Sequence, residues 1–318
     1  MNMKHEAVIQ KTFLNRKGVH YRLRRIIRSW QLYALLMLPI TSLIIFEYVP
    51  MYGILMAFKE YKVSRGIWGS PWVGLKYFEM FFTSPSFSQL IRNTLTLSLY
   101  AFLASFAFPI LLALMLNEVK QMAFKKFVQT VTYIPYFLST VVVIGLVMQV
   151  FSYSGIMNSF LHSFGLEKVD YLAKPMMFQH LYVWSGIWQH TGYAAIIYIA
   201  ALAGVDTALY EAALLDGASR IKKIIHIDIP SILPVIVILF ILDAGGILSV
   251  GFEKAYLLQN PVNTSVSEVI STYVYKIGLQ NAQYSFGTAV GLFNSVVSLT
   301  MIIIVNWIAR RVNETSLW

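Results

Sequence analysis

Residues 211–250 read EAALLDGASRIKKIIHIDIPSILPVIVILFILDAGGILSV, a polar loop that runs directly into a long apolar segment. Strong helix formers extend from Tyr210 to Leu215 and place Glu211 in the first turn, where an acidic side chain suits the helix dipole. Gly217 then permits the chain to turn. Pro230 opens the apolar segment at a position that a helix tolerates. About 20 mostly apolar residues suffice to cross a bilayer, so this stretch predicts a membrane helix entered from a loop.

Between the turn and the apolar segment the sequence is amphipathic. The isoleucines at 221, 224, 225 and 227 are predicted to face the membrane. The basic side chains of Arg220, Lys222 and Lys223 are predicted to face water or lipid headgroups. The loop is therefore expected to lie along the membrane surface.

Five more segments of similar length and apolar character occur along the chain. None of them alternates in polarity over about ten residues, as the strands of a membrane β-barrel would. The sequence therefore predicts an all-α integral membrane protein with six transmembrane helices, at about 33–57, 93–116, 127–151, 179–203, 231–250 and 287–309.

The composition supports a membrane protein. Hydrophobic residues make up 57% of the 318 residues and charged residues only 13%, with a mean hydropathy of +0.62. A soluble domain is usually nearer one quarter charged. Cysteine is absent, which excludes disulfides, thiolate metal sites and cysteine nucleophiles. The net charge of +10 is concentrated in the first 29 residues, so it indicates membrane topology and not a nucleic-acid partner.

The distribution of Lys and Arg predicts the orientation. An even number of crossings places both termini on one side, together with the connections after the second and fourth helices. That side carries sixteen Lys and Arg residues, and the opposite loops carry roughly half as many. Because basic residues favour the inner side, a multi-pass protein of the cytoplasmic membrane with both termini in the cytoplasm is expected. The longer outer loops, about 59–86, 152–178 and 251–286, are expected to be ordered caps over a cavity.

Taken by residue type alone, the loop at 211–219 permits two interpretations. The methyl side chains of Ala212 and Ala213 would let a helix enter a groove on another protein closely, while Glu211 could hydrogen-bond a partner cation. The alternative is a surface helix that merely connects two spans.

A family resemblance favours the first interpretation. The spacing of Glu211-Ala212-Ala213, Gly217, Ile227 and Pro230 resembles the EAA loop of permease subunits in binding-protein-dependent ABC importers. The resemblance implies a type I ABC importer permease (MetI-like) fold. It also implies that the loop forms a coupling helix held in a cleft of a separate ATPase. The residues expected to make this coupling are Glu211, Ala212, Ala213, Asp216, Gly217, Ile227 and Pro230.

Other motifs are similar to the carbohydrate-uptake branch of this family. They are Trp72-Val73-Gly74-Leu75-Lys76-Tyr77-Phe78, Arg92-Asn93-Thr94-Leu95 and Asp216-Gly217-Ala218-Ser219. Tyr48-Val49-Pro50-Met51-Tyr52-Gly53 and Asn260-Pro261 resemble a narrower subgroup that handles oligosaccharides from polysaccharide breakdown. The resemblance thus implies an oligosaccharide substrate, with pectin-derived fragments such as rhamnogalacturonan oligosaccharides among the candidates.

The resemblance also implies a domain organisation and a set of partners. A basic cytoplasmic tail at 1–29 would precede the six-helix permease domain at 30–310, with the coupling loop at 204–230 and a short cytoplasmic tail at 311–318. Expected partners are a second, homologous permease of different sequence, two cytoplasmic ATPase subunits, an extracellular solute-binding lipoprotein and the lipid bilayer, but no nucleic acid.

The chain lacks the motifs that would make it an enzyme. It has no Gly-x-x-x-x-Gly-Lys-Ser/Thr loop, so ATP and magnesium are expected on the partner ATPase, and this chain is expected to bind no cofactor and no metal. A different class remains open, the ion-coupled secondary transporter, in which Glu47 and Asp243 would be the intramembrane carboxylates. Asp243 could equally accept hydrogen bonds from a neighbouring helix.

Six residues are candidates for the substrate pathway. Aromatic faces cover the apolar side of a sugar ring, and amides or acids bind its hydroxyls. Trp184 and Trp188 share one helix face because they are four positions apart. The remaining candidates are His190, Tyr193, Gln149 and Asn294. The alternative for each is an aromatic belt at the membrane surface or a hydrogen bond between helices.

Overall fold

The computed structural model describes residues 29–246 and 250–313. The chain comprises two compact units, residues 1–55 and 56–318. Apart from Ser29, the predicted basic tail lies outside the described residues, and so do residues 314–318 of the predicted carboxyl-terminal tail.

The first predicted span forms a 29-residue apolar helix. It consists of α2 (Trp30–Leu43), the π-helical turn η1 (Ile44–Tyr48) and the 3-10 helix η2 (Val49–Phe58). The change from α geometry precedes Pro50, which has no backbone N–H and whose ring would clash with the carbonyl four residues earlier. Glu47 lies in this π-helical turn. The predicted span at 33–57 is confirmed.

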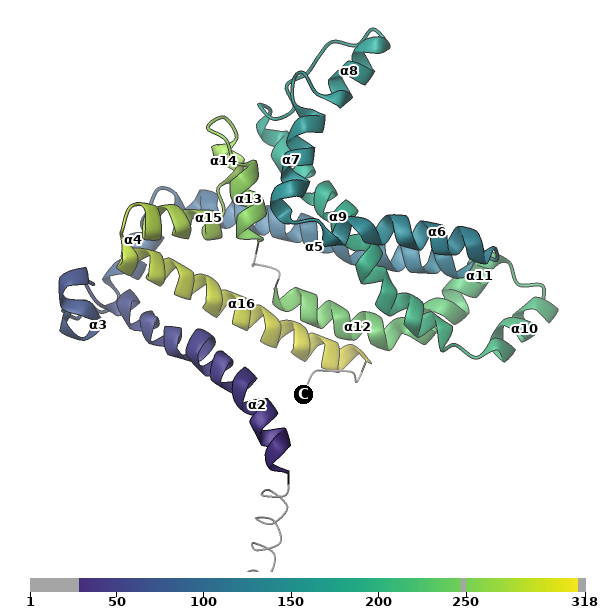
Figure 1. Ribbon diagram of the computed structural model, residues 1–318, viewed down its shortest axis with the longest axis horizontal. Helices are drawn as coiled ribbons and strands as arrows, with labels where there is room; N and C mark the ends of the chain where they lie inside the picture. Colours follow the sequence, from purple (N-terminus) through teal and green to yellow (C-terminus); the bar gives the residue numbers. More distant parts are fainter. Residues whose placement is uncertain (1–28, 247–249, 314–318) are drawn as a thin grey trace, which may run out of the picture. The chain divides into compact units, whose positions relative to one another are not determined.

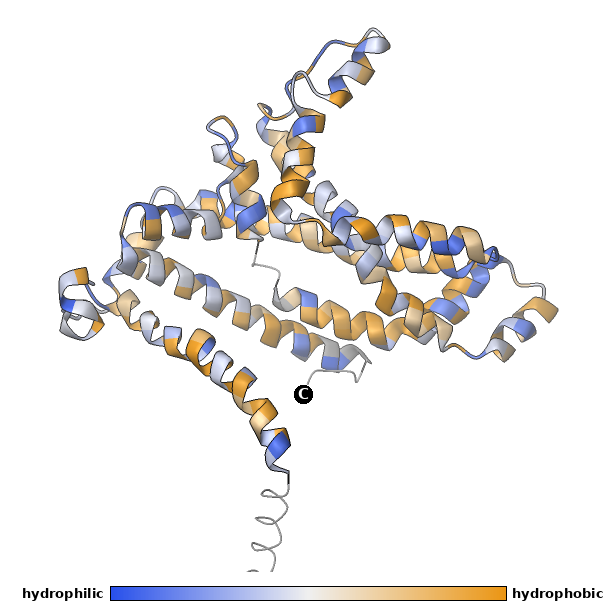
Figure 2. Ribbon diagram, viewed as in Figure 1, coloured by the Kyte–Doolittle hydropathy of each residue, from blue (hydrophilic) through white to orange (hydrophobic). Residues whose placement is uncertain are grey.

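Four further predicted spans are long helices of the second unit. They are α5 (Phe87–Asn117), α9 (Pro175–Ala203), α12 (Ile229–Gly245) and α16 (Tyr284–Asn313). In Figure 1, α5 runs alongside α9, and α12 runs alongside α16. Figure 2 shows α12 to be hydrophobic along almost its whole length, as a helix surrounded by lipid and other helices requires. Among the described residues, five helices are long and apolar enough to cross a membrane: Trp30–Phe58, Phe87–Asn117, Thr140–Ser163, Arg220–Ala244 and Tyr284–Ile308. The bent pair of α9 and α10 (Thr207–Leu215) is a sixth if it counts as one span.

The third predicted span, 127–151, is wrong as one continuous helix. The structure divides it into α6 (Met122–Tyr133), the 3-10 helix η4 (Ile134–Phe137) and α7 (Thr140–Phe151). Pro135 cannot continue an α-helix, and the Ser139 side chain accepts a hydrogen bond from the Val142 N–H to start a new helix. The Leu138 carbonyl exposed by the break accepts a hydrogen bond from Gln189 Nε2 at 3.0 Å, which stabilises it.

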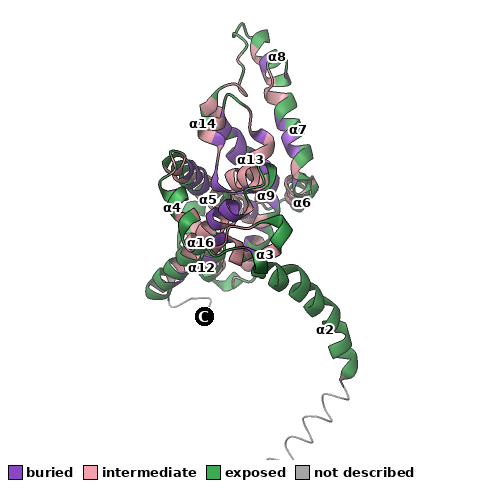
Figure 3. Ribbon diagram, turned by 90° about the vertical axis from the view of Figure 1, so that its left-hand side faces the viewer, coloured by how far each residue is buried: buried purple, intermediate pink, exposed green. Residues whose placement is uncertain are grey.

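Three apolar clusters hold the second unit together. The largest joins α5, α7 and α9 to residues 250–269, the next joins α5, α9 and α12, and the third joins Phe81 and Leu90 to α16. Figure 3 shows the buried residues concentrated where α5, α9 and α13 (Phe252–Leu258) lie. At Gly192 an added Cβ would overlap the Thr132 carbonyl, so the absence of a side chain lets α9 approach α6.

The predicted outer loops are folded segments, as expected. They contain η3 (Val63–Arg65), α3 (Gly66–Gly69), α4 (Lys76–Phe82), α8 (Ile156–Ser163), α13, α14 (Thr264–Ser267), α15 (Ile270–Val274) and η6 (Tyr275–Gln280). The α4 and α15 segments lie at the opposite end of the second unit from α10 and α11 (Arg220–Lys223) (Figure 1). Asn158 is fully buried and accepts from the Val169 N–H at 2.9 Å, which closes the loop after α8.

Candidate functional site

The loop between α9 and α12 begins with a capped helix. The Asp206 carboxylate accepts a hydrogen bond from the Ala208 N–H at 2.9 Å, so α10 starts at Thr207. The helix therefore starts earlier than predicted from Tyr210, and Glu211 lies in its middle and not in its first turn. The predicted helix is confirmed, but its cap was missed.

The turn after this helix is fixed by two backbone hydrogen bonds. The Ala218 N–H donates to the Ala213 carbonyl at 2.9 Å, and the Gly217 N–H donates to the Leu214 carbonyl at 3.1 Å. This pattern is the Schellman motif, which needs a left-handed residue, and Gly217 has φ of +67°. The predicted turn at Gly217 is confirmed.

The outer face of the loop is largely exposed. Glu211, Ala212, Asp216 and Gly217 are exposed, and Ala213 is half-buried. The apolar side chains of Leu214, Leu215 and Ile221 are also exposed, with Leu215 90% accessible. These side chains leave apolar surface that another protein or the membrane can cover.

The inner face of the loop is attached to the membrane helices through Asp228. This residue is fully buried at the end of the π-helical turn η5 (Ile224–Asp228). Its Oδ1 accepts hydrogen bonds from the Tyr210 hydroxyl on α10 and from Asn117 Nδ2 at the end of α5, the latter at 3.4 Å. Burial, and then the hydrogen bond to Asp228, raises the pKa of Tyr210 to about 12, so the phenol stays protonated and donates. One carboxylate thus connects three helical segments.

A second connection lies nearby. Glu118 Oε1 pairs with Lys223 Nζ at 3.5 Å, and Glu118 Oε2 lies 3.9 Å from Arg220 Nε. Lys223 was predicted to face water or lipid headgroups, but its side chain is only 15% accessible where it pairs with Glu118. Ile227 is half-buried in the π-helical turn, and Pro230 is the second residue of α12. The π-helical turn accommodates Pro230 within a helix that runs from Arg220 to Ala244 without interruption.

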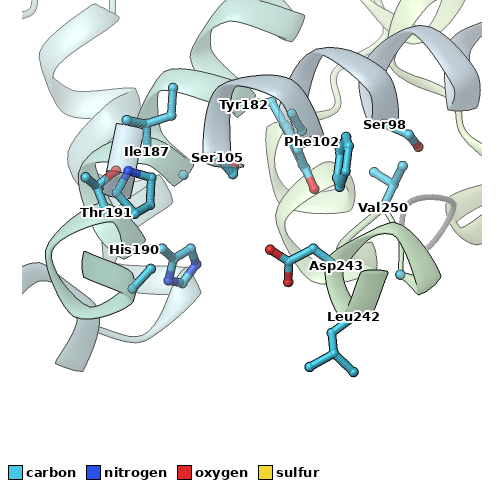
Figure 4. Close-up of a pocket in the computed structure, with 15 residues that line it drawn as sticks. Ser98, Phe102, Ser105, Tyr182, Ile187, His190, Thr191, Leu242, Asp243 and Val250 are labelled. Carbon is cyan, nitrogen blue, oxygen red and sulfur yellow. The ribbon is translucent and has the colours of Figure 1, made fainter. Parts of the chain in front are cut away.

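A cavity of about 460 Å³ lies between α5, α9 and α12. It is here called the polar cavity, because Asp243, His190 and Tyr182 line it together with apolar residues. Figure 4 shows the Asp243 carboxylate and the His190 imidazole on facing sides of this cavity, with the Tyr182 hydroxyl above Asp243. Ser98 and Thr191 are also among its lining residues, but their hydroxyl oxygens are buried, and neither has a hydrogen-bond partner within the described part of the chain. The polar side chains of Asp243, His190 and Tyr182 let this cavity bind a polar molecule.

A second cavity of about 310 Å³, here called the lysine cavity, adjoins the first. The two share five lining residues, namely Ala101, Ser105, Tyr182, Gly186 and His190. The lysine cavity is covered by the start of α13, which contributes Glu253 and Lys254. This arrangement supports the prediction that the outer loop 251–286 covers a cavity.

A third cavity of about 400 Å³ is mostly apolar and holds both predicted tryptophans. Trp184 and Trp188 line it together with Phe151, Tyr171 and His180. Trp184 packs edge-on against Phe108 with ring centroids 5.3 Å apart. Each tryptophan is about half exposed, at 50% and 49%. Flat aromatic surface of this kind is available to the apolar face of a sugar ring.

The structure therefore separates the six predicted pathway residues. His190 lines the polar and lysine cavities, and the two tryptophans line the third. Tyr193 stacks on Tyr136, with centroids 3.8 Å apart, and lines none of these three cavities. Gln149 is exposed on α7 and Asn294 is half-buried on α16, also outside them. The Oδ1 atom of Asn294 has no partner among the described residues.

Several site residues were missed from the sequence. Tyr182, Thr191 and Lys254 gave no signal because their importance comes from helix packing. The sequence Asp243-Ala244-Gly245-Gly246 indicated that the helix could break around a binding site, and α12 does end at Gly245. Among the described residues no group of three or more His, Cys, Asp or Glu side chains could hold a metal ion.

Comparisons with known proteins agree on one family. The model of the binding-protein-dependent transport system inner membrane component matches residues 20–314. A polygalacturonan/rhamnogalacturonan transport system permease protein, YteP of Bacillus subtilis (strain 168), is 43% identical over 295 residues, covering 92% of each chain.

Solved structures give the same result. A chain of a bacterial ABC transporter involved in the import of the acidic polysaccharide alginate is 43% identical, with a TM-score of 0.84, covering 91% of this chain and 98% of its own. A chain of the alginate transporter in complex with an alginate pentasaccharide-bound periplasmic protein is 42% identical, with a TM-score of 0.85, covering 92% and 99%.

Proposed function

This chain belongs to the binding-protein-dependent transport system inner membrane components, and from that premise we propose that it is the transmembrane subunit of an ATP-driven oligosaccharide importer. Its relatives are permease subunits, so the chain is a transport subunit and not an enzyme. The membership does not support the ion-coupled secondary transporter that Glu47 and Asp243 left open.

The observation that carries the proposal is the coupling loop. Its outer face is exposed, and its inner face is attached to α5 and α12 through Asp228. A partner ATPase that binds the outer face would move α10, and the Tyr210 contact would transmit that movement to the spans. The coupling residues would be Glu211, Ala212, Ala213, Asp216, Gly217, Ile227 and Pro230.

The rest of the assembly follows from the mechanism. One coupling loop per chain suits two chains above two ATPase subunits, which would hold the ATP and magnesium, and a second homologous permease would complete the pathway. A solute-binding protein would deliver substrate from outside, as the alginate transporter's complex with its periplasmic protein suggests. ATP binding would close the ATPases and open the pathway outward, and hydrolysis would reset it. Both termini and the coupling loop would then lie in the cytoplasm.

The substrate would be an acidic oligosaccharide. The named relatives handle polygalacturonan, rhamnogalacturonan or alginate, whose sugars include uronates. The polar cavity supplies hydroxyls for sugar hydroxyls, while Trp184 and Trp188 offer apolar faces. His190 is the predicted residue that reaches the polar side of this pathway. Gln149, Tyr193 and Asn294 would contribute only if a partner chain or a second conformation extends it.

Affinity purification of the tagged protein from its host in mild detergent tests the assembly. We compare the wild type with a Glu211→Arg, Gly217→Pro double variant and with Glu167→Arg, a control at an exposed position in the outer loop before α9. The wild type and the control should recover an ATPase, a second permease and a sugar-binding protein. The double variant should lose the ATPase and retain the second permease.

Two results would contradict the proposal. Equal recovery of the ATPase with the double variant would mean that the loop does not bind it. Recovery of the wild type alone, with uptake driven by an ion gradient, would return the protein to the secondary transporters.

A further inference from the structure

Lys254 is a buried cation at the edge of the transport cavities. It lies on α13, immediately after the fifth span, and lines the lysine cavity opposite α9. The segment that carries it is attached to α9, because the Gly251 N–H donates to the Tyr182 hydroxyl at 3.0 Å. The position of the ammonium group is therefore set by the fold and not by a free loop.

No protein anion neutralises this cation in the described chain. The ion pairs among the described residues involve Arg220, Lys223 and Lys276, and none involves Lys254. Its Nζ instead lies 4.9 Å from the centroid of the Tyr182 ring. The attraction of a cation to an aromatic face is weaker than the cost of burying an ammonium group without a counter-ion.

The structure leaves room for this side chain at the cavity. A Cβ atom added at Gly186 would lie 3.0 Å from Lys254 Nζ, so glycine at this point of α9 makes space for the ammonium group. Burial lowers the pKa of Lys254 to about 7. An anion that enters the cavity would raise the pKa of Lys254 again. The ammonium group would then be charged and would hold the anion.

The other ionisable groups near Lys254 are divided between the two adjoining cavities. His190 on α9 and Glu253 on α13 line the lysine cavity, and Asp243 on α12 lies in the adjoining polar cavity. Glu253 is exposed. An acidic chain would thus be attracted at Lys254 and repelled at Asp243, which favours its carboxylates on the α13 side.

We propose that Lys254 recognises a carboxylate of the passing oligosaccharide and makes the permease selective for acidic over neutral sugars. The proposal rests on the importer function proposed above. A lysine suits this task because it offers a point charge and no rigid fork, so the contact can form and break as the sugar moves on. A pathway residue must bind well enough to admit its substrate and weakly enough to release it.

The experiment compares uptake of an oligogalacturonate trimer with uptake of its methyl-esterified form, in cells carrying the complete importer. The variants are Lys254→Met, which removes the charge, Lys254→Gln, which keeps hydrogen-bond donors without charge, and Lys254→Arg, which keeps the charge. Lys168→Met is the matched control, because Lys168 also lies over an aromatic ring, that of Tyr153 at 6.0 Å, but is exposed and lines none of the three cavities. Amounts of each variant in the membrane are measured alongside.

Lys254→Met and Lys254→Gln both remove the charge-assisted contact. In these two variants the ratio of acidic-trimer uptake to neutral-trimer uptake should therefore fall about tenfold to a hundredfold. The ratio should stay near the wild-type value in Lys254→Arg and Lys168→Met. An unchanged ratio in the uncharged variant that reaches the membrane would overturn the proposal, and so would a wild type that imports only the neutral trimer. A wild type with no ATP-dependent uptake of either trimer would instead remove the importer function itself.

Discussion

The Tyr210 hydroxyl donates a hydrogen bond to the carboxylate of Asp228, a fully buried residue eighteen positions further along the chain. The contact joins the coupling helix α10 to the start of α12 across the turn at Gly217. Asn117 at the end of α5 donates to the same oxygen, so the Asp228 carboxylate links α10 to two long helices. This attaches the loop between α9 and α12 to two long helices, which the proposed coupling role requires.

Removing the Tyr210 hydroxyl is expected to uncouple ATP hydrolysis from transport. Tyr210→Phe leaves the buried Asp228 carboxylate with Asn117 as its donor and lowers stability by about 1–3 kcal/mol. The ATPase should still co-purify, while sugar uptake per ATP hydrolysed falls several-fold in proteoliposomes. Tyr153→Phe in the outer segment after α7 is the control, and equal transport efficiency in the two variants would argue against a coupling role.

The backbone at Gly217 predicts a specific loss of ATPase binding. Its φ of +67° costs an L-residue about 1–2 kcal/mol, and nothing lies within 4 Å of the position that an alanine methyl group would occupy, so Gly217→Ala tests the turn alone. The affinity of the Gly217→Ala permease for its ATPase should fall about fivefold to thirtyfold, measured by titrating the purified ATPase into the purified permease. Gly165, at φ +79° and equally free of neighbours, is the control in the outer loop. Gly165→Ala should leave the affinity unchanged, and a parallel loss in both variants would mean a general folding defect.

Gly192→Ala and Gly145→Ala are expected to have opposite effects on stability, because an added methyl group meets close neighbours only at Gly192. Gly192→Ala forces α9 away from the Thr132 carbonyl and should destabilise the protein by about 1–3 kcal/mol. Gly145→Ala on α7 meets nothing within 4 Å and should stabilise its helix by about 0.5–1 kcal/mol. Thermal unfolding in detergent measures both. A melting temperature for Gly192→Ala at or above wild type would show that α6 and α9 are not in close contact.

The buried Lys254 predicts a pH dependence of stability. Burial lowers its pKa to about 7, whereas an unfolded lysine titrates near pH 10.4. Between these values the unfolded state binds more protons, so stability rises with pH across that window. The wild-type melting temperature should therefore increase from about pH 7 to about pH 9, while Lys254→Met, facing the same His190 and Glu253, should change less. Parallel curves would show that Lys254 titrates as an exposed lysine.

The absence of cysteine makes the orientation directly measurable. Leu215→Cys on the exposed coupling loop and Leu166→Cys in the exposed loop after α8 each introduce one thiol. In intact cells a membrane-impermeant maleimide should label the Leu166 variant and spare the Leu215 variant. After the membrane is opened both should react, and labelling of the Leu215 variant in intact cells would reverse the predicted topology.

The long apolar helices were predictable because membrane crossing is a local property. Twenty apolar residues specify a spanning helix whatever surrounds them, and α5, α9, α12 and α16 lie where hydropathy placed them. The turn at Gly217 was equally predictable from the sequence, since Gly217 and its neighbours form a Schellman motif within a few residues. The break in the third span was within reach of the sequence, because Pro135 and Ser139 carry it.

The sequence by itself determined the membrane class, the positions of most long helices and the helix and turn of the loop between α9 and α12, since each depends on neighbours in the chain. Only the tertiary structure decided which polar residues meet. The Tyr210–Asp228 contact, the face-to-face placement of His190 and Asp243, and the burial of Lys254 beside Gly186 all join separate helices. Whether a buried charge finds a partner depends on helix rotation and packing, which the order of residues along one helix does not specify.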